Sequence, residues 1–184
     1  MKEPDKNKLP PSKLLWHLMN ATDFFKGFDD PGVTKNHIIP MVLFKRISDV
    51  FEEEYQIQLD REGKRMASLK DFYEHYIPEN CKWDDVLTGD DNLLSSLKYA
   101  LVQIERENPQ LEGIFSSMRW HYSDEYGYNR ILRRLMEHIS TYNLSNSNIS
   151  ALDLSLVIIE LDKRTSLQTE NIRYDNMLLS LLSP

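Results

Sequence analysis

The chain has 184 residues, of which 41% are hydrophobic and 28% are charged, with a formal net charge of −7 and one cysteine, Cys81. This length suffices for one domain with a sizeable core, and the composition is that of an ordinary globular protein. A single cysteine excludes an internal disulfide and a cysteine-rich metal site, and it fits a reducing, cytoplasmic compartment. The longest uncharged apolar run, Ile38–Phe44, is too short to span a membrane, so we expect no membrane partner.

The first segments predict a lead-in and a helix. Residues 1–11 are polar and contain prolines, which indicates a disordered lead-in. Ser12 is a candidate N-cap for a helix that runs to about Lys26. One face of this helix carries apolar residues at helical spacing: Leu14, Leu15, Leu18, Ala21 and Phe25. The sequence FDDPG at 28–32 then predicts a turn.

The next helix has the most regular pattern in the chain. It starts near Thr34 or Asn36, includes Pro40 in its first turn and ends at about Glu62, before Gly63. Its apolar face carries Phe44, Ile47, Phe51 and Tyr55. We expect the charged residues between them to face outward, namely Lys45, Arg46, Asp49, Glu52 and Glu53. The acidic residues of 49–62 favour a solvated helix face, with an acidic docking surface as the alternative.

The middle of the chain is less regular. Residues 64–89 predict a short helix followed by a loop or a small β-hairpin that holds Trp83. Asp91 or Asn92 then caps a helix from Leu93 to about Glu107. Its buried stripe consists of Leu94, Leu97, Leu101 and Ile104, and the Asn-Pro step at 108–109 ends it.

The last third predicts one further helix and an ambiguous tail. The helix runs from Asn129 to about Tyr142, and the polar sequence at 143–148 follows it. We therefore place a helical domain at 12–144 and an uncertain helical tail at 145–184. In the tail, Ile149–Asp162 favours a helix despite its β-branched residues, and Leu178–Leu182 is a short apolar segment that would need a partner. The strands of a parallel sheet are missing, so the predicted fold class is mainly α, an irregular helical bundle.

Motifs for catalysis or metal binding do not stand out. The five histidines form neither an H-x-x-x-H nor an H-E-x-x-H pattern. The Glu137-His138 step favours a solvated helix end over an acid/base pair. Cys81 favours a structural thiol over a nucleophile, because no base is indicated beside it. We therefore predict no catalytic residue and no metal site.

Five segments follow one another over roughly Leu14 to Leu144: LLWHLMNATDFFKG, IIPMVLFKRISDVFEEEY, CKWDDVL, IERENPQLEGIF and RILRRLMEHISTYNL. Taken in this order, they resemble the N-terminal domain of the modification (M) subunit of type I restriction-modification systems. Beyond Leu144 the chain departs from the family, because ALDLSLVIIELDKR lacks the Gly and the Tyr-Glu-Tyr pattern that usually follow. The resemblance implies that the complete subunit methylates adenine in DNA with S-adenosylmethionine. It also implies three partners: DNA, the specificity (S) subunit and a second M subunit.

This chemistry needs a tight glycine turn against the cofactor and an Asn- or Asp-Pro-Pro-aromatic loop for the flipped base. The six glycines form no G-x-G turn, and Pro10-Pro11 is not followed by an aromatic residue. We therefore expect this chain alone to bind no cofactor and to methylate nothing. Its expected share is to embrace DNA and to contact other subunits. The alternatives are a helical interaction or regulatory module without DNA contact, and an enzyme of an unrelated class.

One region combines arginines with aromatic residues, as a nucleic-acid contact requires. Its candidate DNA-binding residues are Arg119, Arg130, Arg133 and Arg134, with His121, Tyr122, Tyr126 and Tyr128 among them. The competing interpretation is an aromatic core beneath a solubilising arginine face. The residues alone favour that second interpretation, and the resemblance brings the two close to equal.

Overall fold

The computed structural model describes residues 8–26, 32–89, 92–116 and 125–165, except for the side chains of Lys35, Glu125 and Tyr126. These residues form helices and short helical turns, and they contain no strand. The α-helices are α1 (Pro11–Ala21), α2 (Ile39–Glu62), α3 (Lys64–Ala67), α4 (Trp83–Thr88), α5 (Leu93–Glu107), α6 (Glu125–Ile139) and α7 (Ala151–Thr165). The 3₁₀ turns are η1 (Thr22–Phe25), η3 (Lys70–Phe72) and η4 (Pro109–Leu111), and η2 (Thr34–Ile38) is a π-helical turn. The predicted mainly α class is confirmed.

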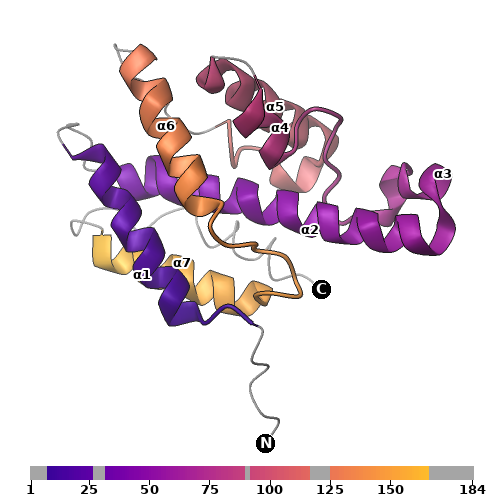
Figure 1. Cartoon of the computed structure of the whole chain (residues 1–184), viewed down its shortest axis with the longest axis horizontal. Helices are drawn as coiled ribbons and strands as arrows, with labels where there is room; N and C mark the ends of the chain where they lie inside the picture. The colour runs from indigo at the N-terminus through magenta and orange to yellow at the C-terminus, as the bar shows by residue number, and fades with distance from the viewer. Residues whose placement is uncertain (1–7, 27–31, 90–91, 117–124, 166–184) are drawn as a thin grey trace, which may run out of the picture.

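Helix α2 is the central element, and the other helices are arranged around it (Figure 1). Pro40 lies in its first turn, where a missing backbone N–H leaves no hydrogen bond unmade. Gly63 follows its last residue with φ of 80°, a left-handed conformation that favours glycine. Every residue from Ile39 to Phe51 is buried, so the first half of α2 is enclosed on all sides.

Apart from α3, which follows the end of α2, the remaining helices cover α2 in two groups. Helices α1 and α7 pack against each other, while α4, α5 and α6 pack together on another side of α2. Leu14 and Leu18 of α1 share one core with Leu132 of α6 and with Leu154 and Leu161 of α7. The polar sequence at 143–148 is therefore not a break in the packing.

The predicted helix in the tail is confirmed as α7. Ser150 accepts a hydrogen bond from the backbone N–H of Asp153 at 3.1 Å, and its hydroxyl donates to the Asp153 carboxylate at 2.7 Å. This pair of hydrogen bonds satisfies the Asp153 N–H, one of the backbone donors in the first turn of the helix. Val157 and Ile158 are buried in the core, so their burial outweighs the low helix propensity of β-branched residues.

The predicted hairpin at Trp83 is wrong, because Trp83 begins α4. Its backbone N–H donates to Ser48 Oγ and its indole N–H to Ser140 Oγ, both at 2.8 Å. These partners lie 35 and 57 residues away in the sequence, so no local pattern could reveal them.

Two predicted helix starts have different outcomes. Ser12 is not an N-cap, because α1 already begins at Pro11, whose fixed φ suits the first helical position. At α5 the prediction of a cap is confirmed, since the Asn92 side chain accepts a hydrogen bond from the Ser95 N–H at 3.2 Å.

Three of the charged residues of α2 do not face solvent, contrary to the prediction. Lys45, Arg46 and Asp49 are only 7%, 4% and 8% exposed. Lys45 and Asp49 form an ion pair within the helix, and the Lys45 ammonium lies 5.8 Å from the centre of the Trp83 ring. Glu52 is exposed and pairs with Lys82 at 2.6 Å, so the outward orientation holds for this residue.

These buried charges hold the loop between α6 and α7. Arg46 donates to the carbonyl of Ile149 at 3.0 Å, and also to the carbonyl of Leu144 and the Asn146 side chain. Asp49 accepts the Leu144 N–H at 2.6 Å. The Glu53 carboxylate accepts two further N–H groups of this loop, at 2.9 and 3.1 Å. We call Arg46, Asp49 and Glu53 the α2 clasp, because they bind both donors and acceptors of the loop backbone.

Several predictions lie outside the described residues. They concern residues 1–7 of the lead-in predicted at 1–11, most of the turn at 28–32, and the apolar segment Leu178–Leu182. The end of that lead-in is ordered, contrary to the prediction, because the Leu9 N–H donates to the Asn148 carbonyl at 2.9 Å and Pro11 begins α1. Within the described ranges, no helix is both long enough and apolar enough to cross a membrane.

Candidate nucleic-acid interface

Helix α6 carries the described residues of the predicted arginine surface. Leu132 and Leu135 face the core, and Arg130 and Arg134 are exposed. Residues four apart lie on the same side of a helix. Arg130 and Arg134 therefore lie on one side of α6 and face outward.

The other predicted members have different positions. Arg133 is half-buried and donates to the carbonyl of Leu87 at 2.7 Å, so it ties α6 to α4. Tyr128 is fully buried, and its hydroxyl lies 3.0 Å from His37 Nδ1. Tyr128 thus belongs to the aromatic core of the competing interpretation. Arg119, His121 and Tyr122 lie outside the described residues, as does the side chain of Tyr126.

A chain of stacked rings, not anticipated from the sequence, runs from α1 across to α6. The Lys13 ammonium lies 5.2 Å from the centre of the Tyr142 ring, which meets the His17 ring edge-on at 4.8 Å. His17 stacks on His138, and Phe24 meets His138 edge-on at 5.1 Å. Arg134 ends the series with its guanidinium carbon 5.0 Å from the Phe24 ring centre. We call these six residues the ring ladder: Lys13, Tyr142, His17, His138, Phe24 and Arg134.

The two histidines at the centre of the ring ladder are held in one geometry. Their ring centres are 3.7 Å apart and their planes differ by 8°. His17 Nε2 lies 2.8 Å from the carbonyl of His138, and His138 Nε2 lies 2.9 Å from the carbonyl of His17. Because a carbonyl oxygen only accepts, both Nε2 atoms carry the hydrogen. His138 is half-buried between helices, so the predicted solvated helix end holds for Glu137, which is exposed, and not for His138.

The ring ladder is suited to contact a polyanion. Its four rings are half-exposed and a cation lies at each end, Lys13 on α1 and Arg134 on α6. Rings of this kind can stack with bases, and arginines bind phosphate oxygens through paired N–H groups. Burial lowers the pKa of His17, and the neighbouring His138 and Lys13 add to this effect, against the hydrogen bond to the His138 carbonyl. His17 is therefore neutral near pH 7.

Sequence reasoning missed the ring ladder because its members come from distant segments. His17 and His138 are 121 residues apart, and neither spacing nor composition connects them. The only signal of the ring ladder in the sequence was on α1, which carries aromatic and cationic residues. Lys13 and His17 lie on one side of this helix.

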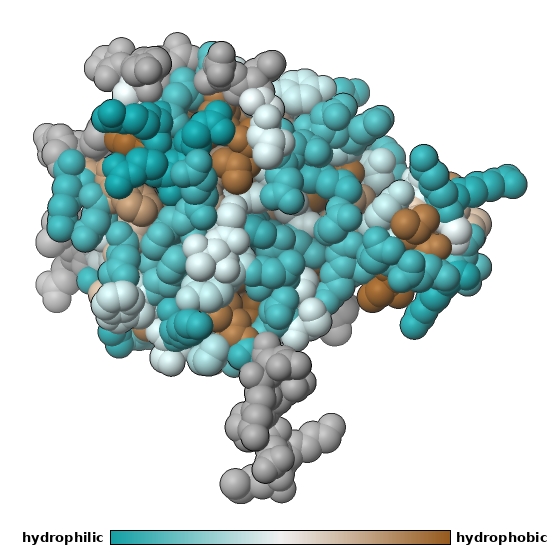
Figure 2. Space-filling view, in the orientation of Figure 1, coloured by the Kyte–Doolittle hydropathy of each residue, from teal (hydrophilic) through white to brown (hydrophobic). Residues whose placement is uncertain are grey.

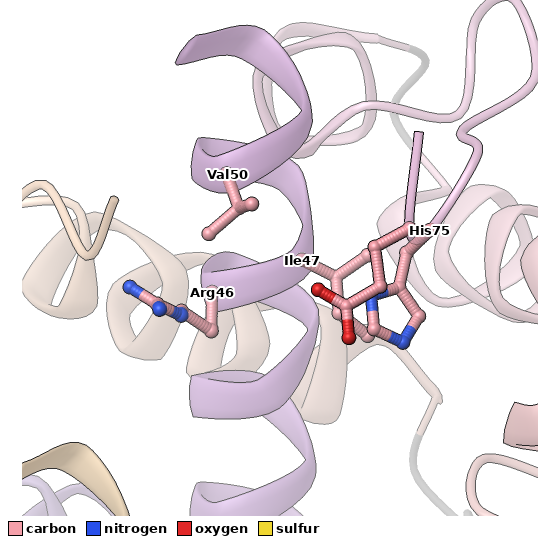
Figure 3. A pocket seen from close by; sticks show the side chains of 5 residues that line it. Arg46, Ile47, Val50 and His75 are labelled. Atoms are coloured by element: carbon pink, nitrogen blue, oxygen red, sulfur yellow. The ribbon is translucent and has the colours of Figure 1, made fainter. Parts of the chain in front are cut away.

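The described residues also form a small pocket beside α2 (Figure 3). Arg46, Ile47 and Val50 of α2 line it together with Glu74 and His75. Its cavity volume is about 30 Å³, far below the roughly 300–1,000 Å³ of small-molecule sites. The Nε2 atom of His75 has no hydrogen-bond partner, and burial lowers the pKa of this residue. A water molecule fits this pocket better than a cofactor does.

Neither a metal site nor a reactive thiol is found in the described part of the chain. No group of three or more His, Cys, Asp or Glu residues there could hold a metal ion. Cys81 is 1% exposed, and burial together with the charge of Asp85 raises its pKa. A buried thiol with a raised pKa is a poor nucleophile.

Comparison with protein-family models matches residues 14–139 to the family described as HsdM N-terminal domain. The chain belongs to this family. A comparison with curated proteins gave no match. The HsdM match confirms the resemblance to the type I restriction-modification M subunit, and it runs from α1 to the last residue of α6. It includes four members of the ring ladder, whereas the loop held by the α2 clasp and helix α7 lie beyond it.

Proposed function

We propose that this HsdM N-terminal domain embraces DNA within a type I restriction-modification methyltransferase, and that it also contacts a neighbouring subunit. The observation that carries the DNA contact is the pair of exposed arginines, Arg130 and Arg134, at one end of the ring ladder. As a subunit that acts on DNA, the chain would work in the cytoplasm.

The charge balance supports a local contact rather than general affinity for polyanions. The chain has a formal net charge of −7, so long-range attraction to DNA is weak. Arg130, Arg134 and Lys13 instead place positive charge on one surface of α1 and α6. Each phosphate contact made by such a residue contributes to affinity and makes that affinity depend on salt.

Alanine at both Arg130 and Arg134 should weaken DNA binding by the assembled methyltransferase. Because each arginine neutralises one phosphate, the slope of log K against log [salt] should become shallower by about 2 in total. Fluorescence anisotropy of labelled duplex DNA over a salt series measures both quantities.

A matched control is the pair Lys98→Ala and Arg106→Ala, which removes the same charge from two exposed residues of α5. This control should leave the affinity and the slope close to those of the unaltered complex. Equal losses in both double variants would contradict a contact at Arg130 and Arg134. An unchanged affinity in the Arg130 and Arg134 variant would do so as well.

We assign the chemistry to the complete subunit rather than to this domain. S-adenosylmethionine would bind there, where it would donate the methyl group to adenine. The residues of this chain do not fit such a cofactor, since they provide no G-x-G turn and the pocket beside His75 is too small. The domain's proposed role is to hold DNA and partners in position.

The proposed subunit contact lies at the C-terminal end of α2, away from the arginines of α6. Ile57, Leu69 and Phe72 are 43%, 46% and 40% exposed there. Figure 2 shows hydrophobic side chains among hydrophilic ones at the end of the molecule formed by α3 and the last turns of α2. We call Ile57, Leu69 and Phe72 the α3 tip. Exposed apolar side chains rimmed by polar ones are typical of protein-protein contacts, and the S subunit and a second M subunit are the proposed partners.

A further inference from the structure

Helix α7 has two apolar faces, of which only one is covered. Its inner face contributes Leu154, Val157, Ile158 and Leu161 to the core. On the other side Leu152, Leu156 and Ile159 are 60%, 55% and 36% exposed. Their spacing of four and three residues places them in one stripe along the helix. A helix that is apolar on both faces is normally buried on both, so this outer stripe requires an occupant.

We propose that the outer stripe of α7 is the docking site of the segment Leu178–Leu182 of the same chain. This segment, LLSLL, lies in the sequence that follows α7 and outside the described residues. Its four leucines match the aliphatic chemistry of the stripe. The contact would shield apolar surface from water at both partners.

The distance along the chain allows this contact. Leu156 precedes the end of α7 by nine residues, which is about 14 Å at the rise of an α-helix. Residues 166–177 connect α7 to the segment, and twelve residues span up to about 40 Å. The segment can therefore turn back and run along the stripe.

The size of the stripe favours a tethered occupant over a second copy of the chain. Three partly exposed aliphatic side chains alone do not supply the roughly 800 Å² that each partner of a stable interface buries. A tethered segment needs less contact, because a connection of this length keeps it at an effective concentration on the order of millimolar.

The accessibility of a thiol placed in the stripe tests this proposal in the full-length chain. Leu156→Cys provides the reporter, and Tyr99→Cys on α5, where the native side chain is 61% exposed, provides a freely accessible reference. Native Cys81 is 1% exposed, so it gives a low background and reports any unfolding. The measured quantity is the rate of maleimide labelling at low protein concentration.

If the segment docks, the thiol at position 156 should react about tenfold more slowly than the thiol at position 99. Leu179→Asp with Leu182→Asp should remove this protection, because charged residues cannot bury against the stripe. Asn171→Asp with Asn176→Asp adds the same charge to the connecting sequence and should leave the protection intact. Cys81 should remain unreactive in every variant.

Three results would overturn the proposal. The first is full reactivity at position 156 in the chain without further substitutions. The second is protection that survives Leu179→Asp with Leu182→Asp. The third is protection that disappears on dilution, which would assign the stripe to a second copy of the chain. The DNA-binding proposal does not depend on any of these results.

Discussion

Arg46 shows how one buried charge in a helix can fix a loop that is distant in sequence. Its guanidinium donates to two backbone carbonyls and one side-chain oxygen of the loop, about 100 residues further along. Burial lowers the pKa of Arg46, an effect that the nearby carboxylates of Glu53 and Asp49 oppose. The planar group with its five donors suits this task in a way that an ammonium group does not.

Replacing Arg46 with Ala should destabilise the fold strongly. The substitution leaves buried carbonyls without donors and removes the cation beside Glu53, while Asp49 keeps only Lys45, so we expect a loss of about 3–5 kcal/mol in the free energy of unfolding. Arg46→Lys should recover part of this, because it keeps the charge but not the forked geometry. Urea unfolding at pH 7 measures both variants.

The control for this experiment is Arg164→Ala. Arg164 is exposed and pairs with Glu160 one turn away at 2.7 Å, so its removal should cost about 0.5 kcal/mol or less. If Arg46→Ala were no more costly than Arg164→Ala, the clasp would not stabilise the loop.

The α2 clasp also marks a limit of prediction at the scale of single residues. The apolar pattern of α2 correctly identified Phe44, Ile47 and Phe51 as core residues. The same pattern assigned Arg46 and Asp49 to solvent, because periodicity separates polar from apolar residues but does not reveal a polar partner 95 or more residues away. In the same way it grouped Arg130, Arg133 and Arg134, although the carbonyl that binds Arg133 belongs to Leu87.

At the scale of elements, regular helices could be predicted and contacts between them could not. Helix α5 followed from the Asn92 cap and its leucine stripe, since both signals are local. Helix α4 did not, because its six residues depend on bonds from Trp83 to Ser48 and Ser140. The ring ladder between α1 and α6 is also a contact between helices, so it could not be predicted.

The histidine pair of the ring ladder makes the α1–α6 contact sensitive to pH. Protonation of His17 would place a positive charge on a ring whose centre is 3.7 Å from that of His138, with Lys13 at one end of the same ladder. The pKa of His17 is lowered in the folded chain, mainly by burial. The unfolded chain therefore binds more protons below about pH 6.5, and the free energy of unfolding falls as the pH drops through this range.

We expect the His17 imidazole to titrate below its ordinary pKa of 6.5 in an NMR titration of the ring nitrogens. Above pH 6.5 this residue should not change the stability, because it is neutral in both states. His75 has a lowered pKa for the same reason, so the NMR signal of His17 is a more specific measure than global unfolding. A His17 pKa at or above 6.5 would rule out this assignment.

For the whole molecule, α2 separates two surfaces with different proposed partners. Its 24 residues correspond to about 36 Å of helix. The ring ladder lies on α1 and α6, toward the N-terminal half of α2, and the α3 tip lies at the opposite end (Figure 1). Because a packed helix does not bend readily, α2 would keep the proposed DNA contact and the proposed subunit contact at a fixed separation.

This separation predicts that the two contacts can be removed independently. Ile57→Asp with Phe72→Asp should weaken assembly with the purified partner subunits by tenfold or more, because charged side chains replace the apolar contact. A tenfold loss corresponds to about 1.4 kcal/mol of binding free energy. The complex that still forms should bind DNA with an unchanged slope of log K against log [salt]. Alanine at Arg130 and Arg134 should have the reverse effect, which analytical ultracentrifugation and anisotropy together can measure.

If either double variant impaired both assembly and DNA binding, the two surfaces would not be separate. Both variants change exposed side chains, so thermal unfolding should remain close to that of the unaltered chain.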